Sequence, residues 1–347
     1  MTLYRTRFCG KEMVGYLDDT GWALHSRCQD QIHVGILGRE NDTTETTNKR
    51  NLRRVISGLD SLTRELEADP SLDELNRFRE RIEALDRLDA YALDRHFSTL
   101  DCESVDPGLY RRARDLYAKL EATNLKVYET IRGGIQRGAG PNTLLQRTLK
   151  SGAVGNAISL ATGEGYDYLD ELVSGVLRFA KPDAGITQLP TEMVSYQPTP
   201  ARHIFDLIAR TQLAEQDVLI DLGSGLGHVP LLASICRSTR TIGIEVQAAY
   251  VNCARQSAYE LKLNNVTFIQ QDARDADLSG GTVFYLYTPF LGTILRTVMD
   301  LLRREAVSRQ IRVCTFGPCT PSVREERWLE PVKTLGAGQI AVFRSRN

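Results

Sequence analysis

The chain has 347 residues, of which 42% are hydrophobic and 25% are charged. This length suits two domains, and the composition is that of a globular protein rather than of a disordered chain. Residues 1–190 carry 26 basic and 29 acidic side chains, a net charge of −3, and the remainder carries 17 and 15, a net charge of +2. Neither half has the basic excess that gripping a phosphate backbone requires, so the charge disfavours a nucleic-acid substrate.

No apolar stretch follows the first eight residues, and no run of about 18 apolar residues occurs, so we expect neither a secretory signal nor a membrane span. Seven cysteines without a C-x-x-C pair indicate reduced thiols in a cytoplasmic protein. Cys314 and Cys319 are the closest pair, and no further ligands follow at short spacing, so we expect no metal site.

The first part of the chain, residues 1–47, is predicted as a short β-rich segment. Its strands are expected at residues 12–17, 22–25 and 32–37, with a turn at 18–21. The polar stretch 41–47 is predicted as a linker.

Residues 48–190 are predicted as a mainly helical region for substrate recognition or for interaction with a partner. Ser71 and Glu74 have the spacing of a capping box at the start of its second helix. The helices are expected to pack on one another or on the second domain, and a coiled-coil dimerisation arm is the alternative. Apolar residues recur at helical spacing over 52–66, 72–88 and 109–131.

A Gly-, Asn- and Ser-rich stretch, residues 132–164, follows these helices. Loops of this length are commonly functional, so we interpret it as a possible lid over a ligand site. A short helix is expected over residues 166–180, before Pro182.

Residues 191–347 alternate short apolar strands with helices, which indicates a parallel sheet buried on both faces. The fold class is therefore α/β, doubly wound and mostly parallel. The last strand follows a glycine-rich turn instead of a helix, which favours a terminal antiparallel hairpin. Strands are expected at 218–221, 241–245, 266–269, 283–287, 311–315 and 339–343, and helices at 204–208, 229–236, 248–263 and 290–302.

A glycine loop follows the first of these strands. It consists of Gly223, Ser224, Gly225 and Gly227, with Asp221 two residues before the first glycine. Glycines in this place allow a tight turn and let a ligand approach the N–H groups at a helix start.

Two acids follow at the ends of the next strands, Glu245 and Asp272. A carboxylate at the first of these places can accept both ribose hydroxyls, and one at the second can hold an exocyclic adenine amine. The G-x-G-x-G spacing is shorter than the dinucleotide fingerprint and suits a ligand without a pyrophosphate. A Rossmann-type domain that binds NAD, or no nucleotide, is the alternative.

The glycine loop, both acids and the segment Tyr287-Thr288-Pro289-Phe290 together resemble the successive motifs of class I S-adenosylmethionine-dependent methyltransferases. The resemblance covers about residues 190–347 and implies a seven-stranded, Rossmann-like sheet. It implies that Asp221 and the glycine loop hold the methionine end of S-adenosyl-L-methionine. It also implies that Glu245 binds the ribose and that Asp272 and Ala273 meet the adenine.

A finer resemblance, to the non-SET histone-lysine methyltransferases, lies in Ser195-Tyr196-Gln197-Pro198-Thr199-Pro200 and the run into the glycine loop. In that family this approach segment lies over the cofactor, which makes Tyr196 and Thr199 expected cofactor neighbours. The chain departs from that family after the fourth strand, where the family has an Asn-rich segment.

Tyr287-Thr288-Pro289-Phe290 also resembles the Asn-Pro-Pro-Tyr segment of amino-group methyltransferases. Tyr287 stands where that segment has its asparagine, the hydrogen-bond acceptor for the target nitrogen. The functional interpretation is that Tyr287 and Phe290 line the acceptor pocket. The alternative is that Pro289 and Phe290 only end a strand and start a helix.

The sequence thus predicts a methyltransferase that acts on a nitrogen, or less readily an oxygen, of an unidentified protein or small molecule. Neither His228 nor His203 is interpreted as a base: His228 is expected to be a packing residue, and His203 is expected to face solvent. The alternative function is a non-catalytic, S-adenosylmethionine-binding interaction module. The acceptor and the oligomeric state do not follow from the sequence.

Overall fold

The computed structural model describes residues 4–8, 11–15, 43–92, 107–138, 165–182, 191–194, 196–332 and 338–346. The chain divides into two compact units, Met1–Val127 and Tyr128–Asn347. The strands predicted at 22–25 and 32–37 lie outside the described residues, as does the predicted loop from residue 139 to residue 164.

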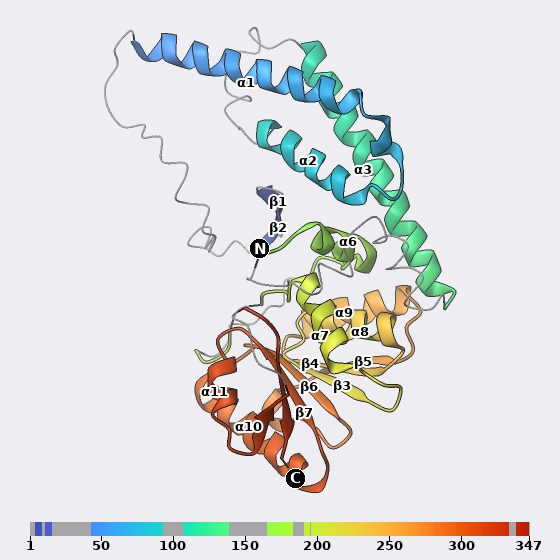
Figure 1. The fold of residues 1–347 in the computed structure, drawn as a ribbon, viewed down its shortest axis with the longest axis vertical. Helices are drawn as coiled ribbons and strands as arrows, with labels where there is room; N and C mark the ends of the chain where they lie inside the picture. Colours follow the sequence, from blue (N-terminus) through green and yellow to red (C-terminus); the bar gives the residue numbers. More distant parts are fainter. Residues whose placement is uncertain are drawn as a thin grey trace. The chain divides into compact units, whose positions relative to one another are not determined.

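The first unit contains an antiparallel hairpin of β1 (Tyr4–Phe8) and β2 (Lys11–Gly15), followed by helices (Figure 1). The helices are α1 (Thr43–Glu67), α2 (Phe78–Ala92) and most of α3 (Pro107–Gln136). The linker predicted at 41–47 is wrong from Thr43 onward, where α1 begins. That polar stretch contains neither Gly nor Pro, so nothing in it stops the helix from extending toward the N-terminus.

The capping box predicted at Ser71 and Glu74 is also wrong. Asp69 is the capping residue, and its carboxylate accepts hydrogen bonds from the backbone N–H and the hydroxyl of Ser71. A single 3-10 turn, Pro70–Asp73, follows, and Glu74 ends that turn.

Arg81 fixes the turn that precedes α2. Its guanidinium is completely buried and donates hydrogen bonds to the carbonyls of Leu72, Glu74 and Leu75. The Glu74 carbonyl also accepts the Arg77 N–H at 3.1 Å, so both the backbone just before α2 and a side chain of α2 hold this turn.

The second unit holds the last turns of α3 and an α/β domain. Its helices are α6 (Tyr168–Leu177), α7 (Ala201–Thr211), α8 (His228–Arg237), α9 (Ala248–Glu260), α10 (Gly292–Ser308) and α11 (Thr320–Arg324). Its strands are β3 (Val218–Leu222), β4 (Arg240–Glu245), β5 (Val266–Gln270), β6 (Val283–Tyr287), β7 (Arg312–Phe316), β8 (Leu329–Pro331) and β9 (Ala341–Ser345). A 3-10 turn, η6 (Ala273–Asp275), follows β5.

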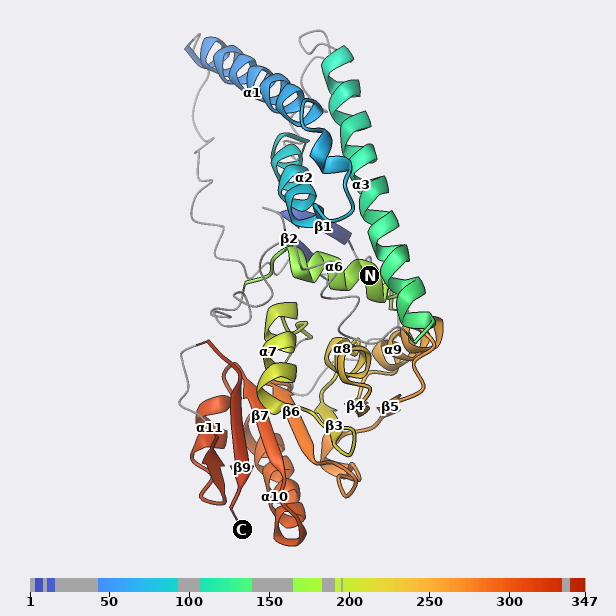
Figure 2. The same ribbon diagram turned by 45° about the vertical axis from the view of Figure 1, so that its right-hand side comes forward.

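These strands form one sheet in the order β5-β4-β3-β6-β7-β9-β8. The first five strands in this order are parallel to one another, and β9 runs antiparallel to both β7 and β8. Helices α7, α8 and α9 lie on one side of the sheet and α10 and α11 on the other (Figures 1 and 2). The predicted doubly wound, mostly parallel, seven-stranded sheet with a terminal antiparallel hairpin is confirmed.

Side chains alternate along the central strands between a face that packs into the core and a face that carries Asp221 and Tyr285. Ile220 and Leu222 of β3 belong to the apolar cluster that also holds Phe284 and Leu286 of β6 and the buried face of α10. Because successive strand residues point to opposite faces, the residues between them point away from α10. Asp221 and Tyr285 are register partners there.

The long helix α3 ends at Gln136, past the predicted start of the glycine-rich loop. Within the second unit, Arg132 places Nη2 2.8 Å from Glu260 Oε2, and Gln136 donates its amide to the Glu260 carbonyl. These contacts stabilise a helix end that Gly133 and Gly134 disfavour by propensity alone.

No described helix, from α1 to α11, combines the length and the apolar character that crossing a bilayer requires.

The carboxylate of Asp170 joins two helix starts in the second unit. One oxygen accepts the backbone N–H of Ala201, the first residue of α7, and the other accepts that of Asp167, the cap of α6. Burial raises the pKa of Asp170 to about 6. The folded unit therefore binds a proton at this carboxyl more tightly than the unfolded chain does.

We expect Asp170→Asn to remove this pH dependence. Between the ordinary pKa of Asp and about 6 the folded state holds the extra proton, so the stability of the wild-type protein falls as the pH rises through that window. The midpoint temperature of unfolding should be higher for the wild type than for the variant, and this difference should be smaller at pH 7.5 than at pH 4.5. A difference that is constant or grows over this range would contradict the assignment.

Candidate active site

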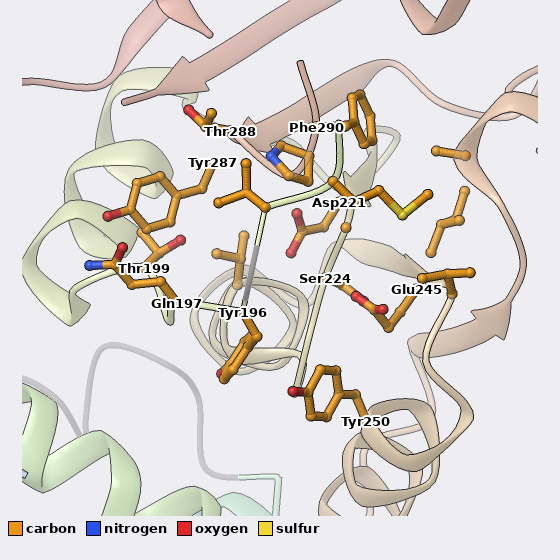
Figure 3. Close-up of a pocket in the computed structure, with 18 of the residues that line it drawn as sticks. Tyr196, Gln197, Thr199, Asp221, Ser224, Glu245, Tyr250, Tyr287, Thr288 and Phe290 are labelled. Atoms are coloured by element: carbon orange, nitrogen blue, oxygen red, sulfur yellow. The ribbon is translucent and has the colours of Figure 1, made fainter. Parts of the chain in front are cut away.

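A pocket of about 270 Å³ opens at the carboxyl ends of the central strands. The strand order reverses between β3 and β6, and ligands of doubly wound sheets bind at such a point. The pocket is lined from β3, β4 and β6, from the loops that follow them, and from the segment before α7 (Figure 3).

The glycine loop adopts the backbone conformation that its residue types permit. Gly223, Gly225 and Gly227 have φ angles of 84°, 51° and 84°, in the left-handed region that favours glycine. The N–H groups of Gly223 and Ser224 donate to the Ile244 carbonyl at 2.9 and 3.0 Å, which fixes the loop to the end of β4.

Close packing adds a second reason for glycine at position 225. A Cβ atom there would lie 2.1 Å from the Tyr196 ring, so the ring rests directly on the loop. The Tyr196 ring also lies 5.0 Å from the Tyr250 ring, centroid to centroid.

Two acids of the pocket are buried. Glu245 accepts hydrogen bonds from the backbone N–H groups of Gly225 and Gln247 at 2.9 and 2.8 Å. Burial raises the pKa of Glu245 against the effect of these hydrogen bonds. Asp221 is 4% exposed, and burial together with the Glu245 charge raises its pKa well above the usual range.

The segment before α7, residues 191–194 and 196–199, is called the strap. Glu192 caps α10, because its carboxylate accepts the N–H groups of Thr293 and Ile294. Val194 donates its N–H to the Pro289 carbonyl at 3.0 Å, and Met193 pairs with Phe290 in an isolated bridge. The strap is therefore held to the loop after β6.

Farther along the strap, Tyr196 places its hydroxyl 3.1 Å from Nδ1 of His228, the first residue of α8. Burial lowers the pKa of His228 to about 4, so the imidazole is neutral near pH 7. Its ring lies 4.7 Å from that of Phe179, centroid to centroid. The histidine thus packs and orients Tyr196.

The side of the pocket beyond β6 is aromatic and uncharged. The Tyr285 hydroxyl lies 3.2 Å from Thr199 Oγ1, and burial raises the pKa of this tyrosine. Tyr287 is partly buried with its ring 5.0 Å from that of Phe316. The Phe316 ring lies 4.2 Å from that of His203, which is fully buried in α7, contrary to the expectation from the sequence that it faces solvent. Figure 3 shows Tyr287 and Thr199 on one side of the pocket and Glu245 on the other.

Thr288 has a φ of 41°, which is unusual for a β-branched residue. Its hydroxyl donates to the Phe316 carbonyl and accepts the N–H of Cys319, both at 3.0 Å. These two hydrogen bonds hold the loop after β6 against the loop after β7, and such strain is typical of functional loops.

Most of the residues predicted from the sequence meet in this pocket, whereas Gly225, Gly227 and Asp272 do not line it. The carboxylate of Asp272 instead bonds Arg274, which lowers its pKa. Helix α10 begins at Gly292 rather than at Phe290, and Phe290 is 3% exposed at the pocket wall. The predicted residues that line the pocket are Tyr196, Thr199, Asp221, Gly223, Ser224, Glu245, Ala273, Tyr287 and Phe290.

Sequence reasoning missed Tyr285, Tyr250 and Gln197 as pocket residues. A signal for Tyr285 was present, because it lies two residues before Tyr287 and so points to the same face of a strand. Gln197 lies within the approach segment between Tyr196 and Thr199, and nothing local marks Tyr250.

The charge of the lining fits S-adenosyl-L-methionine, whose sulfonium and ammonium groups are both positive. Among the described residues that line the pocket, two are carboxylates and none is Lys or Arg. In addition, the buried Ser224 hydroxyl has no hydrogen-bond partner in the described part of the chain. The same described part contains no group of three or more His, Cys, Asp or Glu side chains arranged for a metal ion.

The family model described as "Histone methylation protein DOT1" matches residues 192–275. This segment runs from the strap through the glycine loop and Glu245 to η6, and it ends before β6. A search of the curated proteins gave no match.

Solved structures of methyltransferases resemble less than half of the chain. One is an RNA methyltransferase from Salinibacter ruber in complex with S-adenosyl-L-homocysteine, 29% identical over 43% of this chain and 92% of that one, with a TM-score of 0.37. Another is a precorrin-6y C5,15-methyltransferase from Geobacter metallireducens GS-15, 16% identical over 49% and 95%, with a TM-score of 0.35.

We expect Gly225→Ala to weaken the binding of S-adenosyl-L-homocysteine by about tenfold, or about 1.4 kcal/mol. The added methyl group collides with the Tyr196 ring and disfavours the left-handed backbone of the loop. Calorimetric titration measures the change. The matched control is Gly280→Ala, since no atom lies within 4 Å of a Cβ built at Gly280. Equal affinity of both variants would contradict this account of the loop.

Proposed function

We propose that this chain, an S-adenosylmethionine-dependent methyltransferase by its fold and by the matched segment, transfers the methyl group to a nitrogen of a protein or a small molecule. The observation that carries the proposal is the pocket at the strand switch, which is lined both by two buried carboxylates and by uncharged aromatic side chains. The bound cofactor supplies an activated methyl group on a sulfonium, so the protein has mainly to align the reactants and exclude water.

In this proposal the residues divide between the two ends of the pocket. Asp221, Ser224 and the glycine loop hold the methionine end, and Glu245 accepts the ribose hydroxyls. Ala273 and Asp272 lie at the adenine. Asp272 would then exchange part of its pairing with Arg274 for the adenine amine.

The strap residues Tyr196 and Thr199 are proposed to cover the cofactor. Tyr196 rests on Gly225 and is fixed by His228, and Thr199 is fixed by Tyr285. Both side chains therefore have defined positions beside the glycine loop, which favours alignment of the methyl group over free rotation of its carrier.

The acceptor is best sought first among proteins. The matched family model is described by histone methylation, and core histones are the corresponding probe. The match ends at residue 275, however, and the proposed acceptor wall with Tyr287 and Phe290 lies beyond it. The proposal therefore keeps small molecules as acceptors.

A second candidate function is a cofactor-binding interaction module without catalysis. The observation that favours it is Tyr287, which stands where amino-group methyltransferases have a hydrogen-bonding asparagine. This candidate predicts that the cofactor binds and that no methyl group reaches any acceptor.

The first experiment is calorimetric binding of S-adenosyl-L-methionine and S-adenosyl-L-homocysteine to the wild type and to Glu245→Ala. The variant lacks the proposed ribose acceptor and its hydrogen bond to Gly225, so we expect at least tenfold weaker binding of both ligands. Glu330→Ala, an exposed carboxylate on β8, is the control. An affinity that the Glu245 variant retains in full would exclude the proposed ribose site.

Methyl transfer is tested with labelled S-adenosyl-L-methionine on core histones and on a cell extract. We expect Tyr287→Ala and Phe290→Leu to lower turnover at least tenfold while S-adenosyl-L-homocysteine binding changes little, because both side chains are assigned to the acceptor. Full turnover in both variants would rule out this acceptor wall. Wild-type binding without any transfer would favour the interaction module.

A further inference from the structure

The strap residue Gln197 lines the pocket between Tyr196 and Pro198. Figure 3 shows its side chain beside Tyr287 and Thr199, on the side of the pocket away from Glu245. Gln197 is exposed, and its carboxamide has no hydrogen-bond partner in the part of the chain that the structure describes.

Other polar side chains of the lining are already used within the protein. Thr199 bonds Tyr285, Thr288 bridges the Phe316 carbonyl and the Cys319 N–H, and Tyr196 bonds His228. The carboxamide of Gln271, which also lines the pocket, donates to the Asp275 carbonyl at 2.8 Å. Gln197 thus brings an uncommitted amide oxygen and N–H₂ group to the uncharged end of the pocket.

The backbone around Gln197 is fixed on both sides. Before it, Tyr196 packs on Gly225 and bonds His228. After it, the Pro198 carbonyl accepts a hydrogen bond from the Tyr166 hydroxyl at 2.8 Å. The Cα position is therefore set, while the side chain is left to adapt to a ligand.

We infer that Gln197 determines which acceptor is methylated, by binding a neutral nitrogen that carries at least one N–H. This inference rests on the proposed function. The carboxamide oxygen accepts the N–H of the acceptor and directs the nitrogen lone pair toward the methyl group. Amino-group methyltransferases have a hydrogen-bonding asparagine after the strand, where this chain has Tyr287. Here the amide comes from Gln197 of the strap instead.

The transfer step is balanced without a further reactant. The nitrogen lone pair forms a bond to the methyl carbon, the electron pair of the carbon–sulfur bond returns to sulfur, and the methylated nitrogen releases one proton to solvent. The amide oxygen accepts an N–H of the neutral acceptor and of the methylated ammonium formed from it, until that ammonium releases its proton, so the side chain itself neither gains nor loses a proton.

The test uses two ligands that differ at the methyl position. S-adenosyl-L-homocysteine has a bare thioether there. Sinefungin has a carbon in place of the sulfur and an amine on that carbon in place of the transferred methyl group, so only sinefungin presents N–H groups toward the acceptor side. We expect Gln197→Ala in the full chain to weaken the binding of sinefungin by five- to tenfold and the binding of S-adenosyl-L-homocysteine by less than twofold. Gln197→Glu should tighten sinefungin, because a carboxylate makes a charge-assisted hydrogen bond to its ammonium.

Gln271→Ala is the matched control, because it removes a carboxamide from the same pocket but one that is bound to Asp275. The control should leave the ratio of the two affinities unchanged. A ratio that is also unchanged in both Gln197 variants would overturn the inference and leave the proposed function standing. Absence of binding of either ligand to the wild type would overturn both.

Discussion

The hydrogen bonds of the Glu245 carboxylate to the Gly225 and Gln247 N–H groups hold the site together. They join the loop after β3 to the end of β4, so that two separate strand ends form one rigid edge. The cost of burying this carboxylate is offset by the two donors. The glycine loop is also held by the bonds of Gly223 and Ser224 to the Ile244 carbonyl and by the Gly227 N–H on the Ser224 carbonyl, and the Tyr196 ring rests on this loop at Gly225.

The strap completes this edge from the other side. It is held at Glu192 by the start of α10, at Val194 by Pro289, and at Tyr196 by His228. Two of these attachments use a backbone N–H of the strap or of α10, and the third joins the Tyr196 hydroxyl to the His228 ring. The strap thus forms one side of the pocket and is fixed at three points to the elements that form the rest of it.

How far the sequence predicts this protein depends on the range of the interactions involved. The sheet followed from apolar strands separated by helices, and the glycine loop followed from spacing, because both are local patterns. The capping box at Ser71 did not follow, because the Asp69 carboxylate accepts the hydroxyl and the N–H of Ser71, and the Glu74 N–H donates to the Ser71 carbonyl instead of the hydroxyl. The end of α3 was missed because its contacts with Glu260 lie far along the chain. Gln197 was missed for the same reason, since only the folded strap brings it beside Tyr287.

The two-sided role of Asp170 makes α6 a structural part of the α/β domain. Its carboxylate caps α7, the helix that leads into β3, from a position in α6. A fragment that starts at the strap keeps every cofactor motif yet leaves the first N–H of α7 without this acceptor, and it also loses the Tyr166 hydroxyl from the Pro198 carbonyl. The contacts that support the cofactor motifs therefore begin before the first of those motifs, in α6 and at Tyr166.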